Sequence, residues 1–114
     1  MDYKKELEEV LVELQKSYEK RSNLLKSYLE AKNDLVTAKM NLENRKAEGI
    51  LNGQIEGKNE MIREAVAKSL LITEYTTAEK LNLVVNELQI DLDLESMKYS
   101  FLKDKYTILI SLNS

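Results

Sequence analysis

The stretch GILNGQIEGKNEMIR, residues 49–63, decides how this chain folds. It contains the only three glycines of the molecule, Gly49, Gly53 and Gly57, and it separates two long segments with helical periodicity. Glycine adopts left-handed backbone conformations at little cost, so it is favoured just past the end of a helix. We therefore predict that the chain reverses here, in the elbow of a helical hairpin over about residues 48–59, with Gly49 following the first helix.

The composition favours helix and disfavours the common catalytic chemistries. The 114-residue chain has 32% charged residues, three glycines, and no proline, cysteine, histidine or tryptophan. Residues that break helices are therefore nearly missing. Without histidine or cysteine, the usual catalytic triads, thiolate nucleophiles and zinc sites lose their key groups. We predict a non-enzymatic protein that has no cofactor and no metal.

Charge and hydropathy limit the classes of partner. The chain has 17 Lys and Arg against 20 Asp and Glu, a net charge of −3, which is not the basic footprint of a stand-alone nucleic-acid binder. The start of the chain is rich in acids, unlike a secretory signal, and no apolar run approaches the ~20 residues of a membrane span. These features predict a cytoplasmic protein that does not cross a membrane.

The segment before the elbow has the periodicity of one long helix. From about residue 2 to residue 47, apolar side chains recur every three or four positions. This spacing is typical of an amphipathic helix with a coiled-coil-like seam. One heptad column is interrupted only by Arg21 and otherwise contains Leu7, Leu14, Tyr28, Leu35 and Leu42.

The second helical segment, about residues 60–106, contains more apolar surface than one partner helix covers. One heptad column begins at Leu81 and is broken at Glu95, and a second column contains Leu83, Ile90 and Met97. Two such columns predict burial on more than one side, against a third helix or a second subunit. The interface residues that we predict are Leu88, Leu94, Phe101, Leu102, Tyr106, Ile108, Leu109 and Ile110.

Folding the hairpin about Gly53 predicts which parts of the two helices face each other. It places Leu7 near Tyr99 and leaves an apolar tail, about residues 107–114, beyond the start of the first helix. Because an exposed tail of this kind is an aggregation liability, we expect self-association, as a two-fold dimer, to cover it. The tail is also rich in β-branched residues, so helix and interchain strand both stay open.

The carboxylates Glu87, Asp91 and Glu95 recur at every fourth position and share one helix face. Metal binding is one interpretation, but helical di-metal sites usually add a Glu-x-x-His pattern that this chain cannot form. The simpler interpretation is a solvated face or a row of partners for lysines on the other helix. The register about Gly53 brings Lys16 and Lys20 towards Glu87 and Asp91.

Lys58, Asn59 and Arg63 are the candidate contact residues of the elbow. A helix N-terminus offers free amides to an anion, and nearby basic side chains strengthen that attraction for phosphate. The spacing matches no Walker or dinucleotide motif, however, and Glu60 and Glu64 offset the positive charge. The plain interpretation is an elbow in which Asn59 caps the second helix.

Gly57-Lys58-Asn59, followed by Arg63 and Ala65, resembles the turn of a group of small helical-hairpin proteins from tailed bacteriophages and prophages. These proteins have two long helices around a Gly-Lys-Asn-x-x-x-Arg-x-Ala turn. The resemblance implies a phage-encoded accessory protein that works in the cytoplasm of a bacterial host. It implies no catalytic residues.

Together these patterns predict an all-α fold in a single domain over residues 1–114. We expect a long antiparallel helical hairpin, coiled-coil-like, that assembles into a dimer or a higher helical bundle. The predicted function is that of an interaction or assembly protein that binds itself and other proteins. The alternative is a phage factor that associates with nucleic acid or modulates host defence through Lys58, Asn59 and Arg63.

Overall fold

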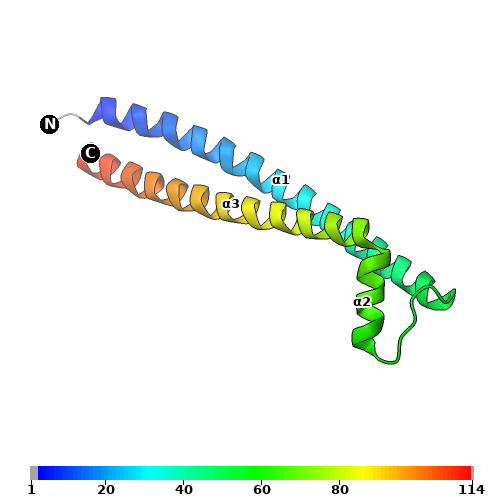
Figure 1. The fold of residues 1–114 in the computed structure, drawn as a ribbon. Coiled ribbons are helices and arrows are strands. Elements are labelled where there is room, and N and C mark those ends of the chain that lie inside the picture. The colour runs from blue at the N-terminus through cyan, green and yellow to red at the C-terminus, as the bar shows by residue number, and fades with distance from the viewer. Residues whose placement is uncertain (1–2, 114) are drawn as a thin grey trace. The chain divides into compact units, whose positions relative to one another are not determined.

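The computed structural model describes residues 3–113, in which every regular element is a helix. The helices are α1 (Lys4–Leu51), α2 (Glu60–Leu70) and α3 (Ile72–Asn113), coloured in chain order in Figure 1. The predicted all-α helical hairpin is confirmed. The predicted limits Asp2 and Ser114 lie outside the described residues.

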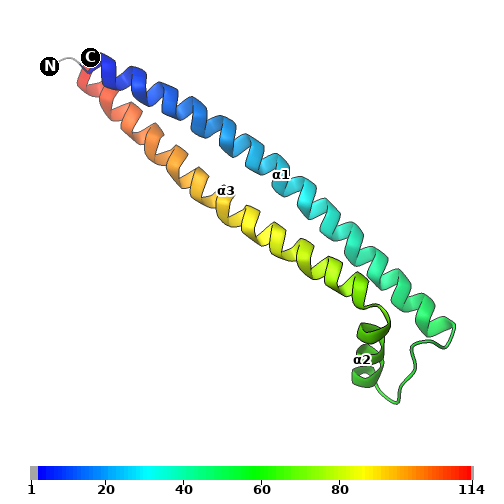
Figure 2. The ribbon, with the colours of Figure 1, turned by 45° about the horizontal axis from the view of Figure 1, so that its top comes forward.

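The chain divides into two compact units, and the described residues of Met1–Leu29 and Glu87–Ser114 form unit 1. In unit 1 the first part of α1 and the last part of α3 run antiparallel and side by side, as Figures 1 and 2 both show. The buried residues of α3 follow the heptad column that begins at Leu81, whereas the buried residues of α1 lie three positions after Leu7 and Leu14, which are half-buried beside them. Together these residues form the packing seam. The buried residues of unit 1 are Val10, Ser17, Glu95, Leu102 and Leu109.

The register of unit 1 differs from the predicted one. Tyr99 lies against Tyr18, with ring centroids 6.2 Å apart, and this is a shift of about three helical turns along α1. The Tyr3 N–H donates to Asn113 Oδ1 at 3.4 Å, so the end of α3 lies beside the start of α1. The predicted unpaired overhang is therefore wrong. The hairpin is not centred on Gly53, because the loop and α2 use chain length that the prediction assigned to helix pairing.

The apolar run at the end of the chain is helical. α3 continues to Asn113, so the second helix does not end near residue 106, and no strand forms in the described part of the tail. Leu102 and Leu109 are buried against α1 on this part of α3. Packing of an apolar helix face outweighs the β preference of the local sequence, since most helical stability in proteins comes from such packing.

Unit 2, Glu30–Asn86, contains the rest of α1, the loop, α2 and the start of α3. In both ribbon views α2 lies at an angle to the start of α3 (Figures 1 and 2). One core cluster of this unit brings Leu42 of α1 together with the loop, α2 and the break that follows α2. Its buried members are Leu42, Ile55, Ala67 and Leu71, with Val66 and Tyr75 packed against them.

The first helix ends about one turn later than predicted, at Leu51. Gly49 therefore lies inside α1, and Gly53 is the glycine with a positive φ, 81°. The Gly53 N–H donates to the Ile50 carbonyl at 3.3 Å, as in a glycine-capped helix end. Gly49 instead permits close packing, because a Cβ at this position would lie 2.6 Å from Ile55 Cδ1.

The predicted second helix is not continuous. It breaks at Leu71, where a φ of −110° and a ψ of 35° end α2, and α3 begins at the next residue. The Leu71 N–H donates to the Ala67 carbonyl at 2.8 Å, and the Leu71 carbonyl accepts from the Tyr75 N–H at 3.0 Å. No proline or glycine lies at the break, so we attribute it to burial of Leu71 and Ala67 against Ile55.

Candidate functional site

A buried polar contact lies within the apolar seam of unit 1. Ser17 Oγ donates to Glu95 Oε1 at 2.7 Å, and these residues are only 2% and 5% exposed. Lys20 Nζ lies 3.6 Å from Glu95 Oε2, so each carboxylate oxygen has a partner on α1. Of the two simpler interpretations of this carboxylate row, Glu95 fits the one in which it pairs with a lysine of the other helix, and its carboxylate faces α1 rather than solvent. Glu87 and Asp91 are exposed.

Arg21, which interrupts the heptad column of α1, also has a polar partner on α3. Arg21 Nε donates to Ser96 Oγ at 2.9 Å. Each polar interruption of one helix therefore meets polar groups of the other. A polar residue at a seam position favours one register over its neighbours, since any shift leaves it facing apolar side chains. Matching Glu95 with Ser17 in the sequence would have found the observed register.

The structure divides the predicted interface residues into two groups. Leu102 and Leu109 are buried in the seam of unit 1, and Leu88 and Tyr106 are partly buried. Since Leu102 and Leu109 already pack within the chain, they do not form a surface for a partner. The predicted interface residues that are exposed are Leu94, Phe101, Ile108 and Ile110.

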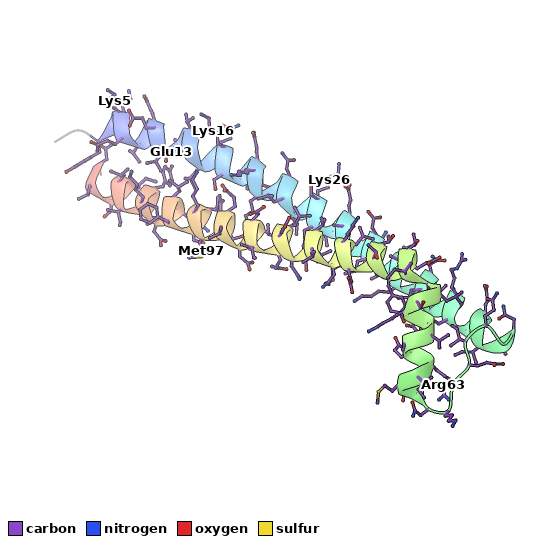
Figure 3. All side chains as sticks on the ribbon, viewed as in Figure 1. Lys5, Glu13, Lys16, Lys26, Arg63 and Met97 are labelled. Carbon is purple, nitrogen blue, oxygen red and sulfur yellow. The ribbon has the colours of Figure 1, made fainter. Side chains whose placement is uncertain are left out.

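Most of the exposed group belongs to an apolar stripe along α3 in unit 1, which we call the outer stripe and which is interrupted at Asp104. It consists of Ile90, Leu94, Met97, Phe101 and Ile108, whose exposed fractions are 58%, 60%, 68%, 67% and 59%. From the helical repeat, the centre of the outer stripe lies roughly 110–140° around α3 from the centre of the seam. Figure 3 shows Met97 on the side of α3 that faces away from α1. Ile90 and Met97 stand in the second heptad column but were not among the predicted interface residues.

A shallow groove runs beside the seam of unit 1. It is walled mainly by tyrosines and aliphatic side chains from both helices, and the tilted Tyr18–Tyr99 pair lies within it. The groove is open rather than enclosed, and Lys103 lies at its edge. It therefore offers a second, smaller apolar surface on a different side of unit 1 from the outer stripe.

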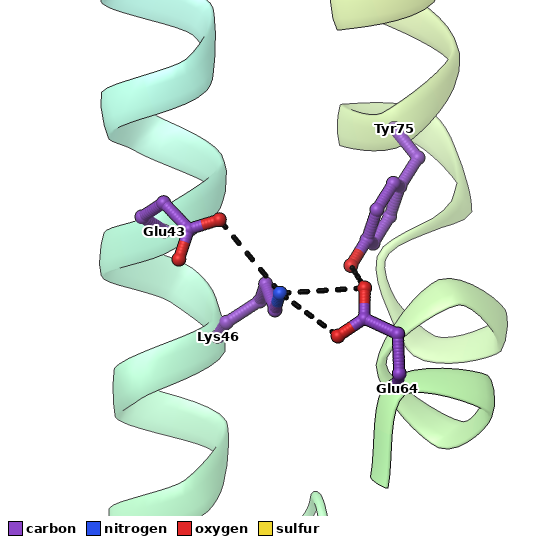
Figure 4. Close-up of polar contacts among 4 residues, drawn as sticks. All are labelled: Glu43, Lys46, Glu64 and Tyr75. Atoms are coloured by element: carbon purple, nitrogen blue, oxygen red, sulfur yellow. Dashed lines mark hydrogen bonds and ion pairs between the residues drawn. The ribbon is translucent and has the colours of Figure 1, made fainter. Parts of the chain in front are cut away.

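In unit 2, a polar cluster joins all three helices (Figure 4). Glu64 of α2 accepts a hydrogen bond from the Tyr75 hydroxyl at 2.6 Å and lies 3.0 Å from Lys46 Nζ. Glu43 lies 3.7 Å from the same ammonium group. The hydrogen bond from Tyr75, followed by that from Lys46, lowers the pKa of the Glu64 carboxyl. The cluster thus ties α2 to both α1 and α3.

The chemistry of this cluster is that of a structural clamp. The hydrogen bond with Glu64 raises the pKa of Lys46, while burial followed by the hydrogen bond with Glu64 raises the pKa of Tyr75. Both raised pKa values favour the protonated form of the side chain. Activation of a lysine or tyrosine as a nucleophile or base needs the opposite direction. A second ion pair, Arg45 Nε to Glu74 Oε1 at 3.3 Å, links α1 and α3 nearby.

The elbow residues have local structural roles. Asn59 is the N-cap of α2, and its side-chain oxygen accepts from the Ile62 N–H at 3.0 Å, so the predicted cap is confirmed. Arg63 Nη1 donates to the Gly57 carbonyl at 3.2 Å across the turn. Lys58 is exposed. The structure therefore shows two of the three predicted contact residues bonded within the turn itself.

The cleft between the end of α1 and α2 carries both signs of charge. Its lining includes Lys46 and Arg63, but also Glu43, Glu60 and Glu64. Within residues 3–113, no group of three or more acidic side chains is arranged to hold a metal ion. Over the same residues, none of the helices is apolar enough for long enough to cross a bilayer.

Comparison with known proteins adds no relative. The chain matches no protein family, no curated protein and no solved structure. Among the described residues of unit 1, the outer stripe contains the five most exposed large apolar side chains.

Proposed function

We propose that the protein is a non-enzymatic helical interaction module that acts by associating with copies of itself. The outer stripe is the observation that carries this proposal. Large apolar side chains that form a continuous exposed patch mark interaction surfaces, and phenylalanine and methionine are enriched at the centres of such surfaces. Phe101 and Met97 are the most exposed members of the outer stripe.

The free energy gained by burying the outer stripe can be compared with the free-energy cost of association. Burial of a large apolar side chain contributes about 1.5–3 kcal/mol, so partial burial of the stripe residues of two copies contributes on the order of 10–20 kcal/mol. Association costs about 4–15 kcal/mol in lost translational and rotational freedom. Micromolar affinity corresponds to about 8 kcal/mol, which lies within the range of differences between this gain and this cost.

The wild-type chain tests the proposal in sedimentation equilibrium over roughly 1–100 µM, the range in which a micromolar complex dissociates. We expect a weight-average mass that rises with concentration above the 13.2 kDa of one chain. A mass of one chain at every concentration would reject the proposal. The melting temperature should rise with protein concentration for the same reason, since association stabilises the folded state by mass action.

The nucleic-acid alternative has less support. Asn59 and Arg63 already have partners within the turn, and carboxylates line the adjoining cleft. The phage origin and the cytoplasmic location stay predictions from the turn motif and the composition.

A further inference from the structure

We propose that the outer stripe pairs with the outer stripe of a second copy in the antiparallel direction, so that two α3 helices lie side by side about a two-fold axis. This inference rests on the proposed function and specifies its surface and geometry. It concerns unit 1 alone, because every member of the outer stripe lies between Glu87 and Asn113.

The stripe is complementary to its own reversed copy. About a two-fold axis between Leu94 and Met97, Ile90 faces the partner's Phe101, and Leu94 faces the partner's Met97. Each of these contacts occurs twice, as an isologous interface requires. The alternating steps of four and three residues keep all of these side chains on one seam. The large Phe101 thus meets a smaller aliphatic side chain rather than its own copy.

Charge along one edge of the stripe supports the same pairing. Asp91 and Lys98 occupy equivalent positions one heptad apart, and both are exposed. Reversal places Asp91 near the partner's Lys98 and Lys98 near the partner's Asp91. Two reciprocal ion pairs then flank the apolar contact, and such pairs help to select the orientation of paired helices.

A parallel pairing of the same stripe is less favourable. It would place Asp104 against the partner's Asp104, between the layers formed by Phe101 and Ile108. Like charges enclosed by apolar layers on both sides are costly to bury. In the antiparallel pairing Asp104 lies beside the partner's Glu87, outside the contact that runs from Ile90 to Phe101, and both carboxylates are exposed in the single chain.

Cross-linking distinguishes the two directions, and the chain suits it because it contains no native cysteine. Two single variants are prepared, Ile90→Cys and Phe101→Cys, and each is treated with a short bismaleimide alone and as an equimolar, subunit-exchanged mixture. In the antiparallel pair, the same position in two copies is separated by about 16 Å along the helix, too far for the reagent. Positions 90 and 101 of different copies lie side by side.

We expect a cross-linked dimer only in the mixture. A dimer in each single variant would overturn the proposal in favour of parallel pairing. The matched control uses Lys5→Cys and Lys16→Cys, which have the same spacing on the exposed face of α1 that points away from α3 (Figure 3). The control variants should give no cross-link, alone or mixed.

Sedimentation of the same samples separates failure of the interface from failure of the proposed function. If the variants remain associated and no mixture cross-links, the outer stripe is not the contact, while self-association still stands. Capture of the control variants alone would place the contact on α1 and would also overturn the proposal. If the wild-type chain is a monomer, both the pairing and the proposed function are rejected.

Discussion

Ser17 Oγ donates a 2.7 Å hydrogen bond to Glu95 Oε1 inside the otherwise apolar seam between α1 and α3 of unit 1. Both side chains are buried, and Lys20 approaches the other carboxylate oxygen. A contact of this kind contributes more to the choice of register than to stability, because desolvation of the carboxylate opposes the attraction. Removal of one partner alone should therefore destabilise the fold, because it leaves the other partner buried without its hydrogen bond.

Ser17→Ala should lower the free energy of unfolding by about 1–3 kcal/mol, because it leaves a buried carboxylate oxygen without its hydrogen bond. The double variant Ser17→Ala with Glu95→Leu should recover most of that loss, since two apolar groups then face each other. Urea denaturation at a fixed protein concentration measures both. A double variant as unstable as the sum of the single variants would contradict this account of the seam.

The seam could be predicted from the sequence, but its register could not be predicted from apolar columns alone. Leucines at a regular spacing fit each other equally well after a shift of one or more heptads. The prediction chose a register by centring the hairpin on Gly53, and the separate helix α2 made that choice wrong. The polar interruptions Arg21 and Glu95 indicate the register, because in the observed one both of them have polar partners on the other helix.

Gly49 packs directly against Ile55. Because of this contact, the effect of Gly49→Ala on stability should change sign when Ile55 is shortened. Gly49→Ala should destabilise the wild-type chain by about 1–3 kcal/mol, because the new Cβ displaces the buried Ile55 side chain. In an Ile55→Ala background the same substitution should be stabilising by up to about 1 kcal/mol, since alanine is the better helix former. Thermal unfolding of the four chains measures the effect. Destabilisation in both backgrounds would show that the contact is not the cause.

Tyr75 controls the pKa of Glu64 through the 2.6 Å hydrogen bond from its hydroxyl. Because this pKa is lowered in the folded state, the contribution of Glu64 to stability is present above about pH 4.3, the ordinary value, and is lost as the pH falls through the folded pKa. Tyr75→Phe should raise the Glu64 pKa and move the acid-induced loss of stability to higher pH. Carboxyl-carbon NMR titration checks this, with Tyr106→Phe in unit 1 as the control. An unchanged Glu64 pKa in Tyr75→Phe would contradict the assignment.

The candidate site shows the same mixture of predictable and unpredictable features. Asn59 could be identified as a cap because its role depends only on the next few residues. The break at Leu71 and the Lys46–Glu64–Tyr75 cluster depend on tertiary packing, and no local residue signals either of them. Ile90 and Met97 were visible as a column, but only the structure shows that this column faces away from α1.

The elbow should not act as a nucleic-acid contact. Asn59 and Arg63 are already bonded within the turn, so Lys58→Ala with Arg63→Ala should leave any binding of DNA or RNA unchanged. Fluorescence anisotropy at low and physiological salt measures this, because phosphate contacts weaken steeply as salt rises. Salt-sensitive binding that the double variant abolishes would support the nucleic-acid alternative instead.

The most direct test of the central claim, that the outer stripe holds copies of this chain together, is the mass of one stripe variant. Met97→Gln with Phe101→Gln removes apolar surface from two exposed positions, so the single chain should keep its helical circular dichroism spectrum. In sedimentation equilibrium it should have the 13.2 kDa mass of one chain at concentrations at which the wild type is associated. The matched control, Lys5→Gln with Lys16→Gln, should keep the wild-type mass. A stripe variant that associates as strongly as the wild type would contradict the claim.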